Sequence, residues 1–273
     1  MMQYKLFFNL TFILYLVAAL SYIIFFILSR DAIGRFGFSI SLSGFLLHTL
    51  ILVIRASQAG HPPISNLYES LSFFAWAVIL IYLLIEQRTK ARIIGVFVLP
   101  FVIFLLGWTA FLDSQIKPLL PALKSYWLGV HGSLCFLSYA CFTLAFCLGV
   151  MYLLQEKQVK SRRIGSFFFR LPSLALLDKL NYWTVTFGFL LLTLGIISGS
   201  IWAAQAWGAF WSWDPKETWS LITWLIYVFY LHARLVRGWR GRKSAYLAIT
   251  GFLAMLFTYL GVSFLLPGLH SYL

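Results

Sequence analysis

The sequence predicts an all-α, polytopic integral membrane protein with about eight transmembrane helices. Of its 273 residues, 61% are hydrophobic and 19% are aromatic, whereas only 11% are charged. A soluble domain carries about a quarter charged residues and fewer than half apolar ones. Eight apolar runs of roughly 20 residues would occupy about 59% of the chain, close to the hydrophobic fraction. This composition excludes a water-soluble globular protein, a disordered chain and a disulfide scaffold.

The predicted spans belong to a single domain over residues 1–273. Runs of about 20 apolar residues place them at about 6–28, 36–54, 67–85, 93–112, 128–154, 183–203, 217–236 and 245–266. The first run is a true span and not a signal peptide, because no A-x-A-like site follows it and Arg30 and Arg35 lie on its far side. Residues 162–180 mix basic side chains with Phe and Leu, and are predicted to lie along the cytoplasmic membrane surface.

Positive charges divide unequally between the two sides of the membrane. The five on the side of the termini are Lys5, Arg55, Lys117, Lys124 and Lys216. The sixteen on the other side are Arg30, Arg35, Arg88, Lys90, Arg92, Lys157, Lys160, Arg162, Arg163, Arg170, Lys179, Arg234, Arg237, Arg240, Arg242 and Lys243. Because cytoplasmic loops carry the excess of Lys and Arg, both termini are predicted to face outward. The net charge of +13 therefore marks topology, and no nucleic-acid partner is predicted.

The three cysteines are predicted to serve packing. Cys135, Cys141 and Cys147 lie six residues apart in one apolar run. Six residues turn a helix by about 240°, on a period of roughly 3.6, so the three share no face and predict no metal cluster. The chain also lacks CxxC and CxxCH, which argues against a thiol oxidoreductase and a c-type cytochrome.

Two outward loops attract attention. In residues 59–70, Asn66 followed by Glu69 has the form of a capping box that starts the third span, and His61 has no obvious chemistry. In residues 202–224 lie six of the eleven tryptophans, namely Trp202, Trp207, Trp211, Trp213, Trp219 and Trp224. An interfacial belt explains two or three of these, spread over several loops. We therefore predict an aromatic platform for a flat, apolar ligand on an outer loop of about 202–219.

The same loop contains a helix-start pattern. Asp214 as N-cap, Pro215 at the first helical position and Glu217 two residues later predict the beginning of the seventh span. Capping is the main role expected of Asp214. Lys216 and the indole N–H groups are then left to meet an anionic edge of a ligand.

The histidines suggest which ligand this is. His61, His131 and His270 are predicted at the outer face, and the last two flank the tryptophan-rich loop. A tetrapyrrole needs an aromatic surface, two imidazoles for its iron and cations for its propionates. The predicted outer face offers all three, so a haem is the ligand that these residues favour. His48 and His232 lie inside spans, where an ionisable residue is a functional candidate by default.

Depth separates these two intramembrane histidines. At about 1.5 Å per residue, His48 lies roughly 18 Å from the cytoplasmic edge and His232 only about 6 Å. Two axial ligands of one iron must lie at nearly the same depth. His232 is therefore predicted to take its mate from water, a lipid-side group or another polypeptide, unless it only snorkels to the interface. Arg234, two residues further along, is a cation well placed for a propionate.

Three motifs in order resemble the CcsA/ResC family of system II cytochrome c biogenesis proteins. They are Gly60-His-Pro-Pro-Ile-Ser-Asn-Leu-Tyr-Glu69, Leu171-Pro-Ser with Leu177-Asp-Lys-Leu-Asn-Tyr182, and Trp207-Gly-Ala-Phe-Trp-Ser-Trp-Asp-Pro-Lys-Glu-Thr-Trp219. The last is similar to the WWD signature of haem-handling proteins. The resemblance runs from about Ala59 to the end of the chain.

The resemblance implies a set of haem-binding residues. His131 and His270 would ligate an outer haem iron, and His232 an inner one whose second ligand comes from a CcsB/ResB partner. The WWD residues implied to hold the macrocycle are Trp207, Trp211, Trp213, Asp214, Lys216 and Trp219. His48 matches no family motif.

The implied function is haem transport to the outer membrane face, with presentation and covalent attachment of haem to apocytochrome c. The implied ligand is haem b with ferrous iron, and the implied partners are CcsB/ResB, an apocytochrome c with a CxxCH segment, a thioredoxin-like thiol reductant and the lipid bilayer. The protein would position its ligand. No nucleophile or general base is visible, so no catalytic residue is predicted. The expected location is a bacterial plasma membrane or a thylakoid membrane.

Two other functions are compatible with parts of the sequence. A system I haem-delivery protein shares a WWD loop and two outer histidines but performs no ligation, and His232 and the eight spans argue against it. A small-solute transporter with an aromatic gate would need paired polar residues along a path and broken helices in matched halves, which the sequence does not offer.

Overall fold

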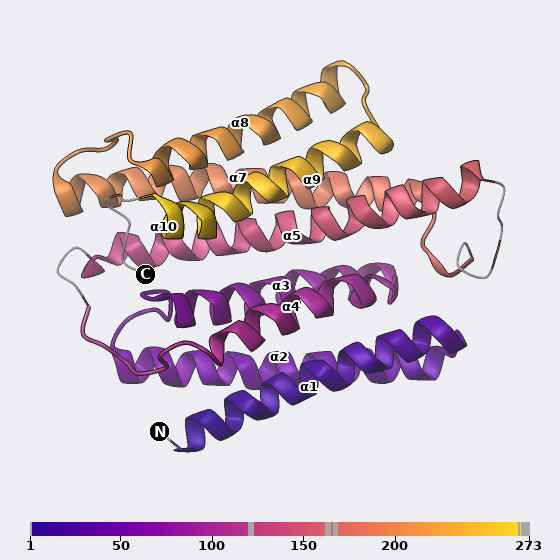
Figure 1. Cartoon of the computed structure of the whole chain (residues 1–273), viewed down its shortest axis with the longest axis horizontal. Coiled ribbons are helices and arrows are strands. Elements are labelled where there is room, and N and C mark those ends of the chain that lie inside the picture. Colours follow the sequence, from indigo (N-terminus) through magenta and orange to yellow (C-terminus); the bar gives the residue numbers. More distant parts are fainter. Residues whose placement is uncertain (1, 120–122, 162–164, 166–168, 267, 269–273) are drawn as a thin grey trace. The chain divides into compact units, whose positions relative to one another are not determined.

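A computed structural model describes residues 2–119, 123–161, 165, 169–266 and 268 (Figure 1). Its elements are α1 (Met2–Leu28), α2 (Asp31–Ala59), α3 (Leu67–Thr89), α4 (Ile94–Thr109), α5 (Tyr126–Lys160), α7 (Leu174–Trp207), α8 (Pro215–Val236), α9 (Arg242–Leu256), the π-helix η2 (Phe257–Gly261) and α10 (Val262–Leu265). Within these residues no strand occurs, and seven helices are long and apolar enough to cross a membrane, counting α9 to α10 as one. The shorter apolar helix α4 occupies the fourth predicted span. The predicted all-α, polytopic membrane fold is confirmed.

The largest correction concerns residues 174–180, which precede the sixth predicted span. They were predicted to lie along the membrane surface, but they form the first turns of α7. Ser173 caps this helix, because its Oγ accepts the Leu176 N–H at 3.3 Å. At 34 residues and about 1.5 Å per residue, α7 is roughly 50 Å long, which exceeds the hydrocarbon core of a bilayer. The remainder of the predicted surface segment lies partly outside the described residues.

The described chain forms two compact units. The first contains α1 to α4 together with the short segment around Arg170, whose guanidinium lies 5.3 Å from the centre of the Phe26 ring. The second contains α5 and the helices from α7 to α10. The proposed outer site falls in the second unit.

In the first unit, α1 and α2 pair through tyrosine rings that lie on glycines. Figure 1 shows the two helices side by side. Tyr22 lies against Gly37 and Tyr15 against Gly44, so each contact recurs after seven residues in opposite directions along an antiparallel pair. Small residues let helix backbones approach closely where lipid provides no hydrophobic driving force. This register brings the polar side chains of α2 into the interior of the unit.

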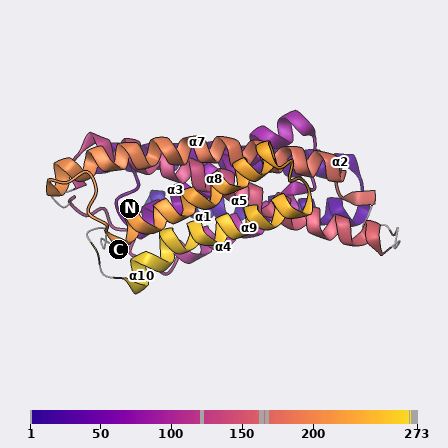
Figure 2. The same ribbon diagram turned by 90° about the horizontal axis from the view of Figure 1, so that it is seen from above.

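In the second unit, α5 and α7 are antiparallel neighbours, and α8 and α9 pack beside them (Figure 2). Phe142 of α5 stacks on Tyr227 of α8, with ring centroids 3.7 Å apart. The π-turn η2 joins α9 to α10, and Thr258 within it donates to the Trp219 carbonyl oxygen at 3.2 Å. The packing therefore ties the last helix to the beginning of α8.

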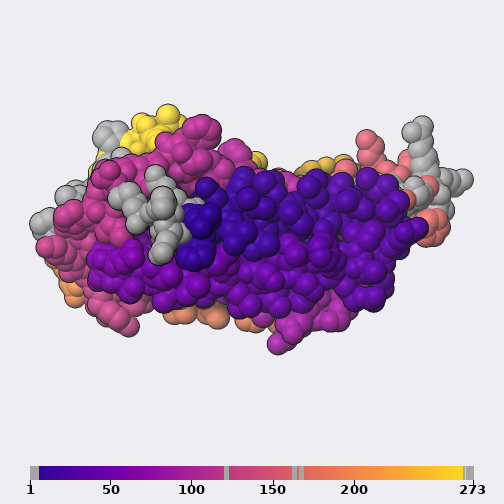
Figure 3. Space-filling view, turned by 90° about the horizontal axis from the view of Figure 1, so that it is seen from below, coloured from indigo at the N-terminus to yellow at the C-terminus, as the bar shows by residue number. Residues whose placement is uncertain are grey.

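The surface of the first unit suits a bilayer. Figure 3 looks onto α1 and α2. Large apolar side chains that are exposed on these two helices include Leu6, Ile13, Leu20, Ile24, Ile27, Phe36, Leu46, Leu50 and Val53. Soluble proteins rarely expose so many large apolar side chains together, so we assign this face to lipid contact.

Candidate functional site

The candidate outer site is built around His131 on the second turn of α5. Ser125 is the N-cap of this helix, and its side chain accepts the Trp127 N–H at 3.3 Å. The His131 ring lies against α7, with Nδ1 2.8 Å from the Gly195 carbonyl oxygen. Because a carbonyl oxygen only accepts hydrogen bonds, Nδ1 carries the proton and Nε2 keeps the lone pair of the neutral ring. His131 is thus oriented as a ligand that would bind iron through Nε2.

An indole lies beside this imidazole. The Trp202 ring is nearly parallel to the His131 ring, at 20° with centroids 6.0 Å apart, and only 2% of Trp202 is exposed. Trp207 makes an edge contact with Trp202, with centroids 5.1 Å apart. The first two tryptophans of the series therefore connect the WWD region to His131 through direct ring contacts.

The predicted six-tryptophan loop is shorter than expected. Trp202 and Trp207 belong to α7, and Trp219 and Trp224 belong to α8. Only Trp211 and Trp213 lie in the connection of residues 208–214, where their rings meet edge to face with centroids 5.8 Å apart. The apolar runs 183–203 and 217–236 already contain Trp202, Trp219 and Trp224, and the extension of α7 to residue 207 adds Trp207 to the helices.

The tryptophans and Lys216 are also less free than predicted. Trp224 donates its indole N–H to Thr193 Oγ1 at 2.9 Å, which is a packing role. Lys216 is partly buried, and its charge interacts with Asp214. Trp213, by contrast, is 69% exposed and its neighbour Phe210 is 66% exposed, so these two side chains form the accessible apolar part of the loop.

Helix capping at Asp214 is confirmed and is more extensive than predicted. The Asp214 side chain accepts the Lys216 N–H at 2.9 Å, and Glu217 accepts the Asp214 N–H at 3.2 Å. Glu217 also accepts the Ser212 N–H at 2.7 Å. These bonds fix Trp213 in a left-handed conformation, with φ of 58°, which is unusual for a bulky residue. The exposed indole is therefore held by its backbone.

The C-terminal segment meets this cap. A side chain at Gly268 would collide with Asp214 Oδ2 and lie 3.2 Å from Pro215 Cδ, so the backbone of Gly268 packs directly on the start of α8. His270 itself lies outside the described residues. The chain therefore passes the WWD loop two residues before the second predicted outer ligand.

The inner candidate, His232, lies on an exposed position of α8, four residues before the end of the helix. Arg234, which the sequence suggested as a cation for a propionate, is engaged within the chain. Its Nη1 and Nη2 donate to the two oxygens of Asp178 at 2.9 and 2.7 Å, and its guanidinium lies 4.6 Å from the Tyr182 ring centre. The role suggested for Arg234 is corrected accordingly.

His48 is a packed histidine of the first unit. It is fully buried, its Nε2 lies 3.0 Å from Ser72 Oγ, and its Nδ1 lies 3.4 Å from the Tyr15 hydroxyl. Both ring nitrogens therefore have partners inside the unit, which fits a structural role.

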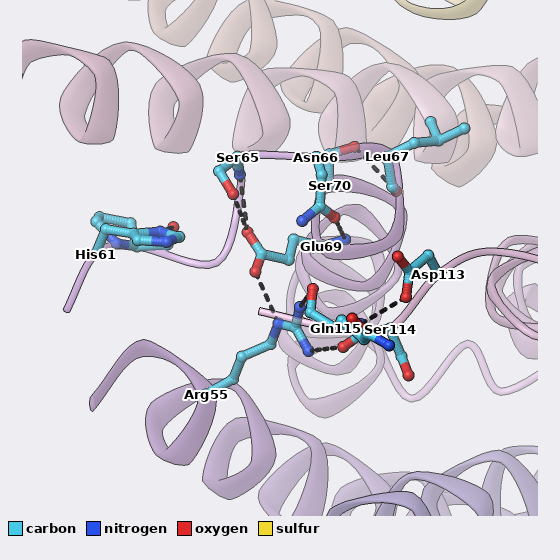
Figure 4. Close-up of polar contacts among 11 residues, drawn as sticks. Arg55, His61, Ser65, Asn66, Leu67, Glu69, Ser70, Asp113, Ser114 and Gln115 are labelled. Atoms are coloured by element: carbon cyan, nitrogen blue, oxygen red, sulfur yellow. Dashed lines mark hydrogen bonds and ion pairs between the residues drawn. The ribbon is translucent and has the colours of Figure 1, made fainter. Parts of the chain in front are cut away.

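A buried ion pair that the sequence did not predict joins the end of α2 to the start of α3 in the first unit. Figure 4 shows Arg55 of α2 reaching Glu69 of α3, with Nε 2.8 Å from Oε1. Arg55 also donates to the carbonyl oxygen of Ser114 at 2.9 Å. The sequence counted Arg55 only as a loop charge, although its place at the end of an apolar run, fourteen residues before an acidic residue, was a usable signal.

The predicted Asn66–Glu69 cap is present in modified form. Asn66 accepts the Glu69 N–H at 2.9 Å, but the Glu69 carboxylate accepts from the N–H and hydroxyl of Ser65 and not from Asn66. In the same loop, His61 Nδ1 lies 2.9 Å from the Pro62 carbonyl oxygen. In the adjoining connection, hydrogen bonds from Lys117 and the Gln115 N–H hold the pKa of Asp113 below its usual range.

The cysteines are free thiols within the described chain, and all three are buried. Cys135 is more than packing, because its sulfur lies 3.7 Å from His131 Nδ1. Among the described residues, no group of three or more His, Cys, Asp or Glu side chains could hold a metal ion.

Comparisons with known proteins agree with this picture. Residues 64–270 match the family described as Cytochrome C assembly protein. The chain is 39% identical to the "Cytochrome c biogenesis protein CcsA" of Guillardia theta, over 97% of this chain and 94% of that one. It is 45% identical to the protein of the same name from Synechococcus sp. (strain CC9902), over 83% of each chain.

A solved structure shares the fold. The "Cytochrome c Heme Lyase CcmF" superposes with a TM-score of 0.66 at 18% identity, over 94% of this chain. The match spans 46% of that longer chain, so this chain corresponds to about half of it.

Proposed function

The chain belongs to the CcsA family of cytochrome c assembly proteins, and from this premise we propose that it carries haem to the outer membrane face and presents it there for attachment to apocytochrome c. It is an integral protein of a plasma or thylakoid membrane with a role in cytochrome c maturation. Haem is its substrate, and a CcsB/ResB-type protein is its partner. The partner contributes the second ligand at an inner site around His232.

The observation that carries the proposal is the orientation of His131. Its Nδ1 donates to the Gly195 carbonyl oxygen, which leaves the lone pair on Nε2, 4.0 Å from Cys135 Sγ, as the donor for ferrous iron. Second-shell bonds of this kind are characteristic of histidines that ligate metals. The passage of Gly268 over the Asp214 cap supports His270 as the opposite ligand, because it brings that end of the chain to the same loop.

The WWD residues have distinct roles in this proposal. Asp214 and Glu217 cap α8 and fix the loop, while Trp211 and the exposed Trp213 offer apolar surface to one face of a macrocycle. Trp207 and Trp219 hold the two ends of the loop on α7 and α8. Lys216 adds a positive charge beside the loop, partly offset by Asp214.

The attachment step needs positioning more than acid–base groups. Each thiol of a CxxCH segment adds across one vinyl group, so that a C–S bond forms on one vinyl carbon and the thiol hydrogen ends on the other. The addition is redox-neutral once both thiols are reduced, a condition that a thioredoxin-like reductant would maintain. The chain contributes by holding the two reactants in one orientation.

The test is the absorption spectrum and haem content of the purified protein. His131→Ala and His270→Ala should each lower haem content and abolish cytochrome c maturation, and added imidazole should partly restore both. His61→Ala is the matched control, because it removes an outer-side histidine that has no assigned ligand role. If His131→Ala or His270→Ala keeps the wild-type spectrum and maturation level, that residue is not an axial ligand.

A further inference from the structure

Helices α5 and α7 are joined by a ladder of side-chain hydrogen bonds to backbone carbonyl oxygens. His131 Nδ1 donates to Gly195 at 2.8 Å, Ser138 Oγ to Gly188 at 2.7 Å, and Asn181 Nδ2 to Ala145 at 2.7 Å. Successive rungs are seven residues apart on both helices, in opposite directions. The rungs of Ser138 and Asn181 are buried, so they fix the register of α5 on α7 and thereby the position of His131 along α7.

The hydrogen bond from His131 to Gly195 can form because α7 has no side chain where the His131 ring lies. A helical side chain covers the turn that precedes its own Cα, so a side chain at residue 199 would cover the carbonyl of Gly195. Residue 199 is glycine, and a Cβ there would lie 2.6 Å from His131 Nδ1 and 2.8 Å from Cε1. Only glycine leaves this carbonyl oxygen open to the imidazole.

From this geometry we infer that the Gly195–Gly199 turn of α7 is a positioning element for haem, which selects the Nδ1–H tautomer of His131 and sets the donor strength of its Nε2. The inference rests on the proposed function of His131 as an iron ligand. A bond from Nδ1–H to a carbonyl oxygen raises the basicity of the metal-binding nitrogen. A stronger donor favours ferric over ferrous iron, so the turn also contributes to the reduction potential of the bound haem.

A neighbouring hydroxyl shares the same acceptor. Ser198 Oγ lies 3.0 Å from the Gly195 carbonyl oxygen and 2.8 Å from that of Leu194. Removing the Ser198 hydroxyl should strengthen the hydrogen bond from His131, because the Gly195 carbonyl oxygen then has one donor fewer. The two changes, at Gly199 and at Ser198, should therefore move the potential in opposite directions, which a general loss of packing would not do.

The experiment measures haem content, spectrum and reduction potential of the full chain, purified without the partner. Gly199→Ala should retain haem about tenfold less well, show a higher potential, and recover the bis-imidazole spectrum when imidazole is added. Gly251→Ala is its matched control, since a Cβ there would lie 2.5 Å from a ring atom, Cζ of Tyr227, in the same unit, and Gly251 is outside the α5–α7 ladder. It should keep the wild-type spectrum and potential.

Ser198→Ala should lower the potential without adding any atom. Its control is Ser200→Ala, whose hydroxyl donates to the Ile197 carbonyl oxygen and does not contact the site. The comparison of Ser198→Ala with Ser200→Ala tests the inference even if Gly199→Ala does not fold. Wild-type potentials in both Gly199→Ala and Ser198→Ala, while His131→Ala loses haem, would overturn the inference and leave the proposed function intact. Retention of the wild-type spectrum in His131→Ala would overturn the proposed outer site itself.

Discussion

Arg234 and Asp178 form a two-bond ion pair that joins α8 to the beginning of α7, with N–O distances of 2.9 and 2.7 Å. The two side chains are only 10% and 16% exposed, and Asp178 also accepts the Gly241 N–H at 2.8 Å. One carboxylate thus connects α7, α8 and the turn before α9. This pair holds the end of the second unit at which His232 lies.

Removing one partner of this pair should destabilise the second unit. Asp178→Ala leaves a largely buried guanidinium without its counter-ion, a change that costs about 3 kcal/mol. The measurement is the midpoint of thermal unfolding in detergent. Lys160→Ala is the control, because Lys160 is 60% exposed in its pair with Glu156, and exposed pairs contribute about 1 kcal/mol or less. Equal shifts for the two variants would contradict a structural role for Asp178.

The two intramembrane histidines should behave differently toward an inner haem. Co-expression with the partner should raise the haem bound per chain, and this increment should disappear in His232→Ala. His48→Ala should retain it, because both nitrogens of His48 have partners within the first unit. Haem content and spectra of the two variants, with and without partner, provide the comparison. Loss of the increment in His48→Ala but not in His232→Ala would reverse the assignment.

The buried Arg55–Glu69 pair should be essential to the first unit. Glu69→Ala would leave Arg55, whose side chain is 3% exposed, without its carboxylate, and should cost about 3–5 kcal/mol. The change should appear as a lower unfolding midpoint and faster proteolysis of residues 113–119. Lys117→Ala, which breaks the exposed pair with Asp113, should shift the midpoint little. A wild-type midpoint in Glu69→Ala would show that the pair is not needed.

The predicted sidedness can be tested with single cysteines. Ser212→Cys, in the WWD loop, should react with a membrane-impermeant thiol reagent from outside. Arg240→Cys, at an exposed position in the turn before α9, should react only after the membrane is opened. The wild-type chain serves as control, since its three cysteines are buried. The reverse pattern would invert the topology and the direction of haem movement.

The sequence by itself determined the spans and the family. Apolar runs of about 20 residues are required wherever a backbone crosses lipid, because every N–H and carbonyl must be satisfied within a helix. The cap at Asp214 could also be predicted from the sequence, since a helix start depends on residues next to each other in the chain. The candidate ligand His131 and the WWD motif also came from the sequence alone.

Only the tertiary structure decided what these residues contact. That His131 donates to Gly195, and that glycine at 199 makes this possible, depends on the register between α5 and α7, which no local pattern encodes. Arg234 looked available for a propionate until packing placed Asp178, 56 residues away, against it. Hydrophobicity specifies which segments enter the membrane, but the pairing of polar groups inside it is set by which helix faces meet.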